Sequence, residues 1–234
     1  MSAIPQNLQA VRQQIATAAR DGGRDAREIA LLAVSKTFGA DAVIAAAAAG
    51  QRAFGENYLQ EALDKIAVLR ATRPDLALEW HFIGPIQSNK TRAIAEQFDW
   101  VHTVEREKIA QRLSAQRPVD LPPLNLCLQV NISGEATKSG VLPSEAGALA
   151  HAIAAMPRVR LRGLMAIPAP QPDVQKQRAA FAQLRMLQQQ LCAQGLPLDT
   201  LSMGMSDDMP AAIAEGATIV RIGSAIFGNR NYAK

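Results

Sequence analysis

A lysine at the end of an apolar run is the first residue that could do covalent chemistry. The run IALLAVSK covers residues 29–36, and its alternation places Leu32, Val34 and Lys36 on one face of an extended strand. If that face points into a protein core, burial lowers the pKa of a lysine amine and frees it to attack a carbonyl. A solvated lysine at a strand end is the alternative, and this strand alone leaves both open.

Small residues and hydroxyls gather at the ends of two later apolar runs. The first run ends in Ser202, Met203, Gly204, Met205 and Ser206, and the second contains Gly223 and Ser224. Backbone N–H groups beside small residues, together with hydroxyls, can bind a phosphate. The alternative is close strand packing that requires glycine. With Lys36 available for an aldehyde, the pattern favours a ligand that carries both an aldehyde and a phosphate.

Arg221 shares a strand face with Gly223 and would lie beneath the ring of such a ligand. A guanidinium only donates hydrogen bonds, so it would leave a pyridine nitrogen unprotonated. That arrangement weakens the ring as an electron sink. The alternative is a core arginine paired with a carboxylate such as Glu56.

Several other polar residues suggest no site of their own. His81, His102 and His151 have no metal-ligand spacing, so no metal is expected. Asp207 and Asp208 precede Met-Pro and are typical of a helix start. The GxG in SMGMS lacks the third glycine of a dinucleotide fingerprint.

The elements that must position these residues alternate regularly along the chain. A helix is predicted over residues 4–21, and eight apolar runs follow, separated by helical segments. Eight such units predict a single α/β domain over residues 1–234, a (β/α)₈ TIM barrel with an extra N-terminal helix. An open doubly wound sheet is the alternative. The runs cover residues 29–36, 52–56, 78–84, 100–104, 124–132, 159–168, 200–206 and 218–228.

Composition restricts the function classes. The net charge is +4, from 25 basic and 21 acidic residues, but the basic residues are scattered and aromatics make up only 4% of the chain. This pattern argues against a nucleic-acid-binding surface. Two distant cysteines suggest a reducing compartment, and neither a signal peptide nor a membrane-spanning run is evident. We therefore expect a cytoplasmic protein.

Long motifs resemble one known family. From about residue 6 to 230 the chain is similar to the pyridoxal phosphate homeostasis proteins, which resemble the barrel domain of alanine racemase. The motifs that carry the resemblance are AVSK (33–36), FGENYLQE (54–61), WHFIGPIQSNK (80–90), VNISGEATKSG (130–140), GLMAIP (163–168) and SMGMSDDMPAAIAEGATIVRIGSAIFG (202–228). The resemblance implies that pyridoxal 5′-phosphate (PLP) is the cofactor, held as a Schiff base, a covalent imine, on Lys36.

The resemblance also implies a set of cofactor-binding residues beside Lys36. Arg221 would face the pyridine nitrogen, and Lys138 is a candidate for a secondary contact or for transfer. Some relatives carry a second lysine soon after the first, where this chain has Thr37 and Phe38. The remaining implied contacts are Asn57 near the ring, Ile83 in the pocket wall, and Ser202, Met203, Gly204, Gly223 and Ser224 at the phosphate.

Three functions are compatible with a reactive Lys36. The resemblance implies a protein that binds PLP in vitamin B6 homeostasis without substantial turnover, so that no residue is catalytic. It would be a monomer, with PLP-dependent apo-enzymes as candidate recipients. A PLP-dependent racemase would need a second acid–base group, yet the only tyrosines are Tyr58 and Tyr232, and no second domain is expected after them. A Schiff-base aldolase would leave Arg221 without a role.

Overall fold

The computed structural model describes residues 3–135 and 137–228, and within them eight parallel strands close into one barrel. Each strand pairs with the next in chain order, and β1 pairs with β8 to complete the ring. This confirms the predicted (β/α)₈ barrel and rules out the open sheet. The strands are β1 (Ala30–Val34), β2 (Ala53–Glu56), β3 (Glu79–Phe82), β4 (Trp100–Val104), β5 (Leu124–Gln129), β6 (Val159–Met165), β7 (Thr200–Ser202) and β8 (Ile219–Ile222).

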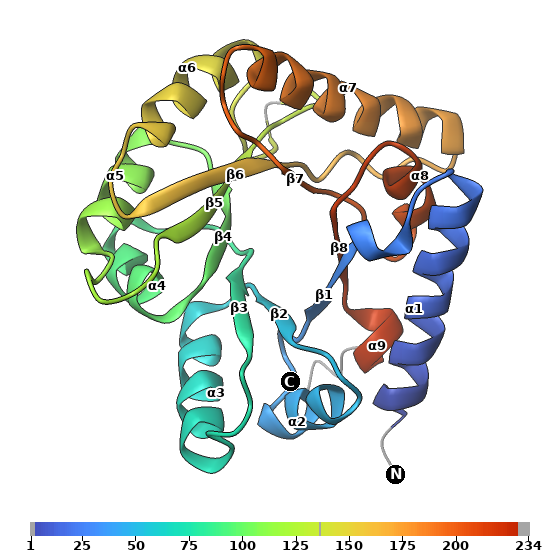
Figure 1. Ribbon diagram of the computed structural model, residues 1–234, viewed down its shortest axis with the longest axis vertical. Coiled ribbons are helices and arrows are strands. Elements are labelled where there is room, and N and C mark those ends of the chain that lie inside the picture. The colour runs from blue at the N-terminus through green and yellow to red at the C-terminus, as the bar shows by residue number, and fades with distance from the viewer. Residues whose placement is uncertain (1–2, 136, 229–234) are drawn as a thin grey trace.

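Helices surround the ring of strands on its outside (Figure 1). Each of the predicted connecting helices is present, with ends that differ from the prediction by a few residues. In chain order the described helices are α1 (Ile4–Asp21), η1 (Ala26–Glu28), α2 (Ala40–Ala48), α3 (Leu59–Thr72), η2 (Ser88–Lys90), α4 (Thr91–Gln97), α5 (Glu107–Gln116), α6 (Pro143–Ala154), α7 (Val174–Ala193), α8 (Met209–Ala214) and α9 (Ser224–Phe227).

The N-terminal helix α1 has the bounds that the apolar spacing predicts. Its first turn contains a proline, which favours a helix start, and Gly23 after it adopts a positive φ of 67°. The helix packs against α8, α9 and α2, beside the strand pair that closes the barrel (Figure 1). Its buried residues recur three or four apart: Ile4, Leu8, Val11, Ile15 and Ala19.

The core is divided by the strands into two parts. The larger part lies between the strands and the helices. A smaller apolar cluster includes Leu32, Trp100, Cys127, Met165 and Ile219, all with at most 7% exposed surface. Leu32 therefore joins a different cluster from its neighbour Ala33, as the alternation of β1 predicts.

Six of the strands end earlier than the apolar runs suggest, and three of these differences bear on the site. β1 stops at Val34, so Lys36 lies in the turn that follows. β7 has only three residues, because Gly204 at φ 93° turns the chain away. The prediction of a strand over 218–228 was wrong in its second half. Residues 224–227 form the short helix α9, whose apolar residues Ile226 and Phe227 are buried as helix rather than as strand.

No helix in the described part of the chain is long and apolar enough to cross a membrane.

Candidate functional site

A cavity of about 260 Å³ opens where the strands of the barrel end. In (β/α)₈ barrels this end carries the reactive groups. The cavity brings together Lys36, Asn57, Ile83, Arg221, Gly223 and Ser224 from the predicted set. Its other lining residues are Val34, Met165, Ile167, Met205, Ser206 and Asp207.

The turn that carries Lys36 is held on both sides. Before it, Ser35 donates its backbone N–H to Gly55 at 3.0 Å and its hydroxyl to Glu56 at 2.5 Å. After it, Thr37 adopts a positive φ of 69° and donates its backbone N–H to Glu61 at 2.6 Å. A threonine rarely adopts this conformation, so the flanking bonds are needed to hold it. Lys36 itself is half-buried and lines the cavity.

A buried ion pair supports the same turn from outside the cavity. The Lys65 ammonium lies 2.6 Å from Glu56 and 3.1 Å from Glu61, and it also donates to the Ser35 carbonyl at 2.9 Å. Burial raises the pKa of Glu56, and the Lys65 charge opposes that rise. The alternative interpretation of the sequence, in which Arg221 pairs with Glu56, is therefore wrong, because Lys65 is the partner of Glu56.

Asn57 and Ile83 lie where adjacent strand ends approach closely. A Cβ on Gly84 would sit 2.0 Å from the Asn57 carbonyl oxygen, so only glycine allows this approach. The Asn57 side-chain oxygen is buried and has no hydrogen-bond partner among the described residues. Because an unpaired buried polar atom is costly, this atom fits a donor on a bound ligand. The donors and acceptors around the cavity thus suit a small polar molecule such as PLP.

Arg221 reaches the cavity from β8 with only 5% of its surface exposed. One guanidinium nitrogen donates to the Ser202 hydroxyl at 2.8 Å, and the other terminal nitrogen donates to the Ala166 carbonyl at 3.0 Å. Burial lowers the pKa of Arg221 to about 10, so the group stays charged near neutral pH. It is therefore a fixed cation and hydrogen-bond donor at the buried end of the cavity.

Ser202, Met203 and Gly204 do not line the cavity. The Ser202 hydroxyl is fully buried and is bonded to Arg221 and to His102, the latter at 2.8 Å. The Met203 side chain is buried in the outer core. The Gly204 carbonyl accepts the backbone N–H of Arg221 at 2.9 Å. These residues support β8 from behind the cavity.

The loop after β7 supplies three further cavity residues, Met205, Ser206 and Asp207. Met205 and Ser206 were expected at the end of a strand, with Met205 packed around the pocket, whereas Asp207 was expected only at a helix start. The loop is fixed by Asp208, which accepts the Met205 backbone N–H at 2.6 Å. Ending the strand at Ser202 would have revealed them, because residues just beyond a barrel strand face the site.

Lys138 does not line the cavity. Its ammonium is 3.5 Å from the Glu135 carboxylate on the same loop.

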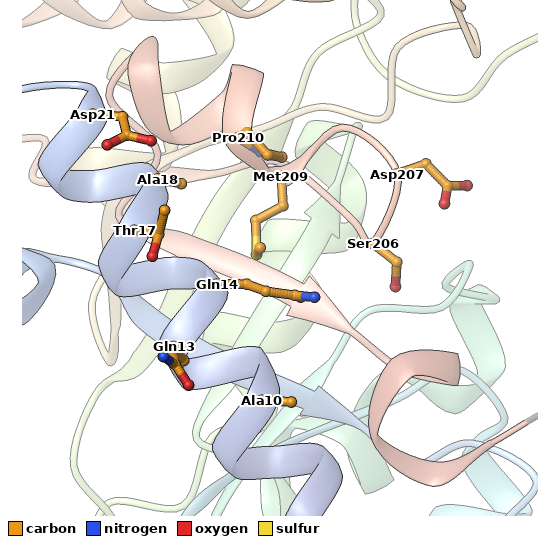
Figure 2. A pocket seen from close by; sticks show the side chains of 10 residues that line it. All are labelled: Ala10, Gln13, Gln14, Thr17, Ala18, Asp21, Ser206, Asp207, Met209 and Pro210. Carbon is orange, nitrogen blue, oxygen red and sulfur yellow. The ribbon is translucent and has the colours of Figure 1, made fainter.

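A second hollow of about 620 Å³ borders the cavity on the outside of the barrel. It lies between α1 and the loop before α8, with Gln14 and Thr17 on one side and Met209 on the other (Figure 2). The two hollows share Ser206 and Asp207. Only the inner one contains Lys36 and Arg221. Over the residues described, no group of three or more histidine, cysteine or acidic side chains could hold a metal ion.

Comparisons with known proteins agree with this fold. The family model for the N-terminal domain of alanine racemase matches residues 3–231. Pyridoxal phosphate homeostasis proteins of Pseudomonas aeruginosa and Escherichia coli are similar to this chain. The first is 62% identical over 99% of this chain and 98% of its own length, and the second is 54% identical over the full length of both.

Solved structures extend the comparison. PipY of Synechococcus elongatus, a structure with PLP bound, is 38% identical, with a TM-score of 0.84 over 96% of this chain and 100% of its own. Alanine racemase of Corynebacterium glutamicum is 21% identical, with a TM-score of 0.64 over 97% of this chain and 62% of its own. At that identity the racemase shares the fold alone.

Proposed function

This chain belongs to the pyridoxal phosphate homeostasis protein family, and we propose that it binds PLP in the cavity that Lys36 and Arg221 share and takes part in PLP homeostasis. One observation carries the proposal. A lysine, a buried arginine and an unpaired amide oxygen line a single cavity at the reactive end of the barrel. A relative whose structure contains PLP has the same fold at 38% identity.

Lys36 is the residue we propose for the covalent link. When bound, PLP supplies an aldehyde that an amine can attack, and a ring that can withdraw electrons. The held turn between Ser35 and Thr37 keeps the Lys36 side chain at the cavity. Lys36 would hold PLP through this amine, as an imine formed with loss of one water.

The other lining residues would bind two different parts of the ligand, its ring and its phosphate. Arg221 would donate to the ring nitrogen, and Asn57 and Ile83 would contact the ring. Gly223 and Ser224 offer a backbone N–H and a hydroxyl to the phosphate. A Cβ on Gly223 would lie 3.2 Å from the Val34 carbonyl, so glycine lets the two strand ends approach. Ser202, Met203 and Gly204 would act from behind this set.

We further propose that the protein is a carrier without substantial turnover, and that it works as a monomer. Arg221 donates hydrogen bonds but cannot protonate a ring nitrogen. Among the described residues that line the cavity there is no tyrosine, and Tyr58 lies outside it. Tyr232 lies outside the described residues. Transfer of PLP to apo-enzymes is the corresponding cellular role.

A PLP-dependent racemase is the second candidate, because one observation favours it. Asp207 brings a carboxylate to the cavity that contains Lys36. A carboxylate can serve as a general acid or base where geometry allows.

Borohydride trapping tests the covalent link. Purified protein loaded with PLP should show the absorbance of an imine, and reduction followed by peptide mapping should find the pyridoxyl group on Lys36. The Lys36→Ala variant should keep its circular dichroism spectrum and lose the band. A label found mainly on Lys90 or Lys138 would contradict the assignment.

A further inference from the structure

Five polar side chains form an unbroken hydrogen-bond chain through the inside of the barrel. Arg221 donates to the Ser202 hydroxyl at 2.8 Å, and that hydroxyl lies 2.8 Å from Nδ1 of His102. Nε2 of His102 lies 2.9 Å from Nδ1 of His81. Nε2 of His81 lies 2.7 Å from the carboxylate of Glu79. The chain connects the cavity with the opposite mouth of the barrel, where β3 begins.

The inner members of this chain are almost completely removed from water. Ser202 and His102 have no exposed surface, His81 is 2% exposed and Arg221 is 5% exposed. Glu79, at the other end, has a side chain that is 50% exposed. His81 is also stacked on Trp100, with 5.4 Å between ring centres and 3° between planes. The side chains therefore have one arrangement in which each polar group keeps a partner.

The direction of every hydrogen bond follows from the two ends of the chain and from the buried Ser202 hydroxyl hydrogen, which needs an acceptor. A guanidinium only donates and an ionised carboxylate only accepts. The hydrogen bond from His81 holds the pKa of Glu79 below its usual value, so Glu79 is ionised near neutral pH. Ser202 must then accept from Arg221 and donate to Nδ1 of His102. His102 in turn donates through Nε2 to His81, which donates through Nε2 to Glu79.

This direction makes both histidines neutral, each with its proton on Nε2. Burial, with the nearby Arg221 cation, holds the pKa of His102 well below its usual value, which agrees with a neutral ring. The reverse direction would place a proton on both nitrogens of His81. It would also leave the Ser202 hydroxyl hydrogen without an acceptor in the chain.

We propose that Ser202, His102, His81 and Glu79 are positioning residues that hold the guanidinium of Arg221 in the plane it needs at the cavity. The Ser202 and Ala166 oxygens accept from the two terminal nitrogens of Arg221. The plane of the guanidinium is therefore set by the hydrogen-bond chain on one side and by Ala166, just after β6, on the other. In this proposal Ser202 acts on Arg221 and not on the phosphate. The ligand part of the test rests on the proposed function, and the tautomer part does not.

The tautomers are measured by ¹⁵N NMR of the histidine rings in the protein without added PLP at pH 7. The protein contains three histidines, so His151→Gln and His81→Gln suffice to assign the signals. We expect the neutral Nε2–H form for both His81 and His102. A charged His81, or a proton on Nδ1 of either ring, would overturn the proposed direction.

The effect on Arg221 is measured by binding PLP and pyridoxal, which lacks the phosphate, to Ser202→Ala. Loss of a hydrogen bond to a charged group weakens binding about 10-fold, and the loss should be equal for the two ligands because Arg221 serves the ring. The matched control is Ser114→Ala, which removes another hydroxyl that is 4% exposed and donates to the Pro157 carbonyl, far from Arg221. It should bind both ligands as the unmodified protein does.

Each result has a defined meaning. A loss for PLP alone would place Ser202 at the phosphate and overturn the proposal, as would unchanged binding of both ligands. If Ser202→Ala does not fold, His102→Gln takes its place with the same expectation. If trapping does not label Lys36 while the tautomers are found as expected, the proposed function fails and the chain of hydrogen bonds stands.

Discussion

At the residue scale, Ser202 and Ser224 are chemically identical side chains in different environments. Ser202 is fully buried and its hydroxyl already has two partners, whereas Ser224 is exposed and lines the cavity. Ser224→Ala should therefore weaken PLP about 10-fold and leave pyridoxal almost unchanged, because a charge-assisted bond to phosphate is lost. Titration with both ligands, followed by absorbance, measures the ratio. Equal losses would place the phosphate away from Ser224.

His102 should make the stability of the fold depend on pH. Burial keeps its pKa in the folded protein well below the value of about 6.5 that it has in an unfolded chain. Between these two values only the unfolded state binds the proton, so stability is complete above about pH 6.5 and falls as the pH is lowered. The loss should be about 1.4 kcal/mol for each pH unit below 6.5.

Urea unfolding at several values between about pH 5 and 7.5, where a histidine of ordinary pKa titrates, measures this slope. His102→Gln should have a shallower slope than the unmodified protein, whatever its absolute stability. His151→Gln is the matched control, because His151 is exposed on α6 and its Nε2 lies 3.4 Å from the side-chain oxygen of Gln194. A slope in His102→Gln as steep as in the unmodified protein would show that another group causes it.

Residue type and position in the sequence predicted much of this site, but not the partners of each side chain. Lys36, Arg221 and Ser224 line the cavity because each lies at or just past a strand end. Ser202 has the right type and also comes at a strand end, yet it faces His102, which is 100 residues away in the chain. That contact depends on how β4 and β7 meet inside the closed barrel, which no local pattern encodes.

At the element scale, the turn between β1 and α2 depends on the ion pair beneath it. Lys65 and Glu56 have side chains that are 3% and 0% exposed, and one Glu56 oxygen has no hydrogen-bond partner among the described residues. Lys65→Ala would leave a buried carboxylate without its counter-charge. It should destabilise the fold by about 3–5 kcal/mol, as measured by urea unfolding.

The control for this experiment is Lys108→Ala, because Lys108 is exposed on α5. It should change the stability by less than about 0.5 kcal/mol. In Lys65→Ala, an additional Glu56→Gln change should recover part of the lost stability, since it removes the unpaired charge. If the double variant is no more stable than Lys65→Ala, the buried charge is not the cause of the loss.

The ends of elements were harder to predict than their existence. The helix over residues 4–21 was predicted with its observed bounds, because an apolar face at helical spacing and two glycines define it. The strand predicted over 218–228 instead breaks at Gly223, whose backbone begins α9. A buried apolar run has no periodicity that separates strand from helix. The short helix α9 therefore could not be predicted from the sequence, because the closed barrel determines where β8 ends.

At the scale of the whole molecule, the closed ring determines which residues meet. β1 and β8 lie at opposite ends of the sequence, and their pairing sets Leu32 beside Arg221. The same pairing brings the Lys36 turn next to Gly223. The repeated alternation of strands and helices predicted this closure, because eight such units complete a barrel. The second hollow, on the outside of the barrel between α1 and the β7–α8 loop, was not predicted, because it arises only where α1 packs beside α8 (Figure 2).

The carrier proposal predicts little turnover when the PLP-loaded protein is given D- or L-alanine, serine or glutamate. Racemisation needs an acid–base group on each face of the substrate, and each such group contributes roughly 10²–10⁴-fold to rate. Beside Lys36, the described lining offers the Asp207 carboxylate on an exposed loop, and Arg221 cannot release a proton near neutral pH.

Chiral chromatography of the products measures turnover, with Lys36→Ala as the blank and Asp207→Ala as the test of the carboxylate. We expect rates far below the order of 1 s⁻¹ that is ordinary for enzymes. Turnover at that rate, lost in Asp207→Ala, would establish a racemase and overturn the carrier proposal.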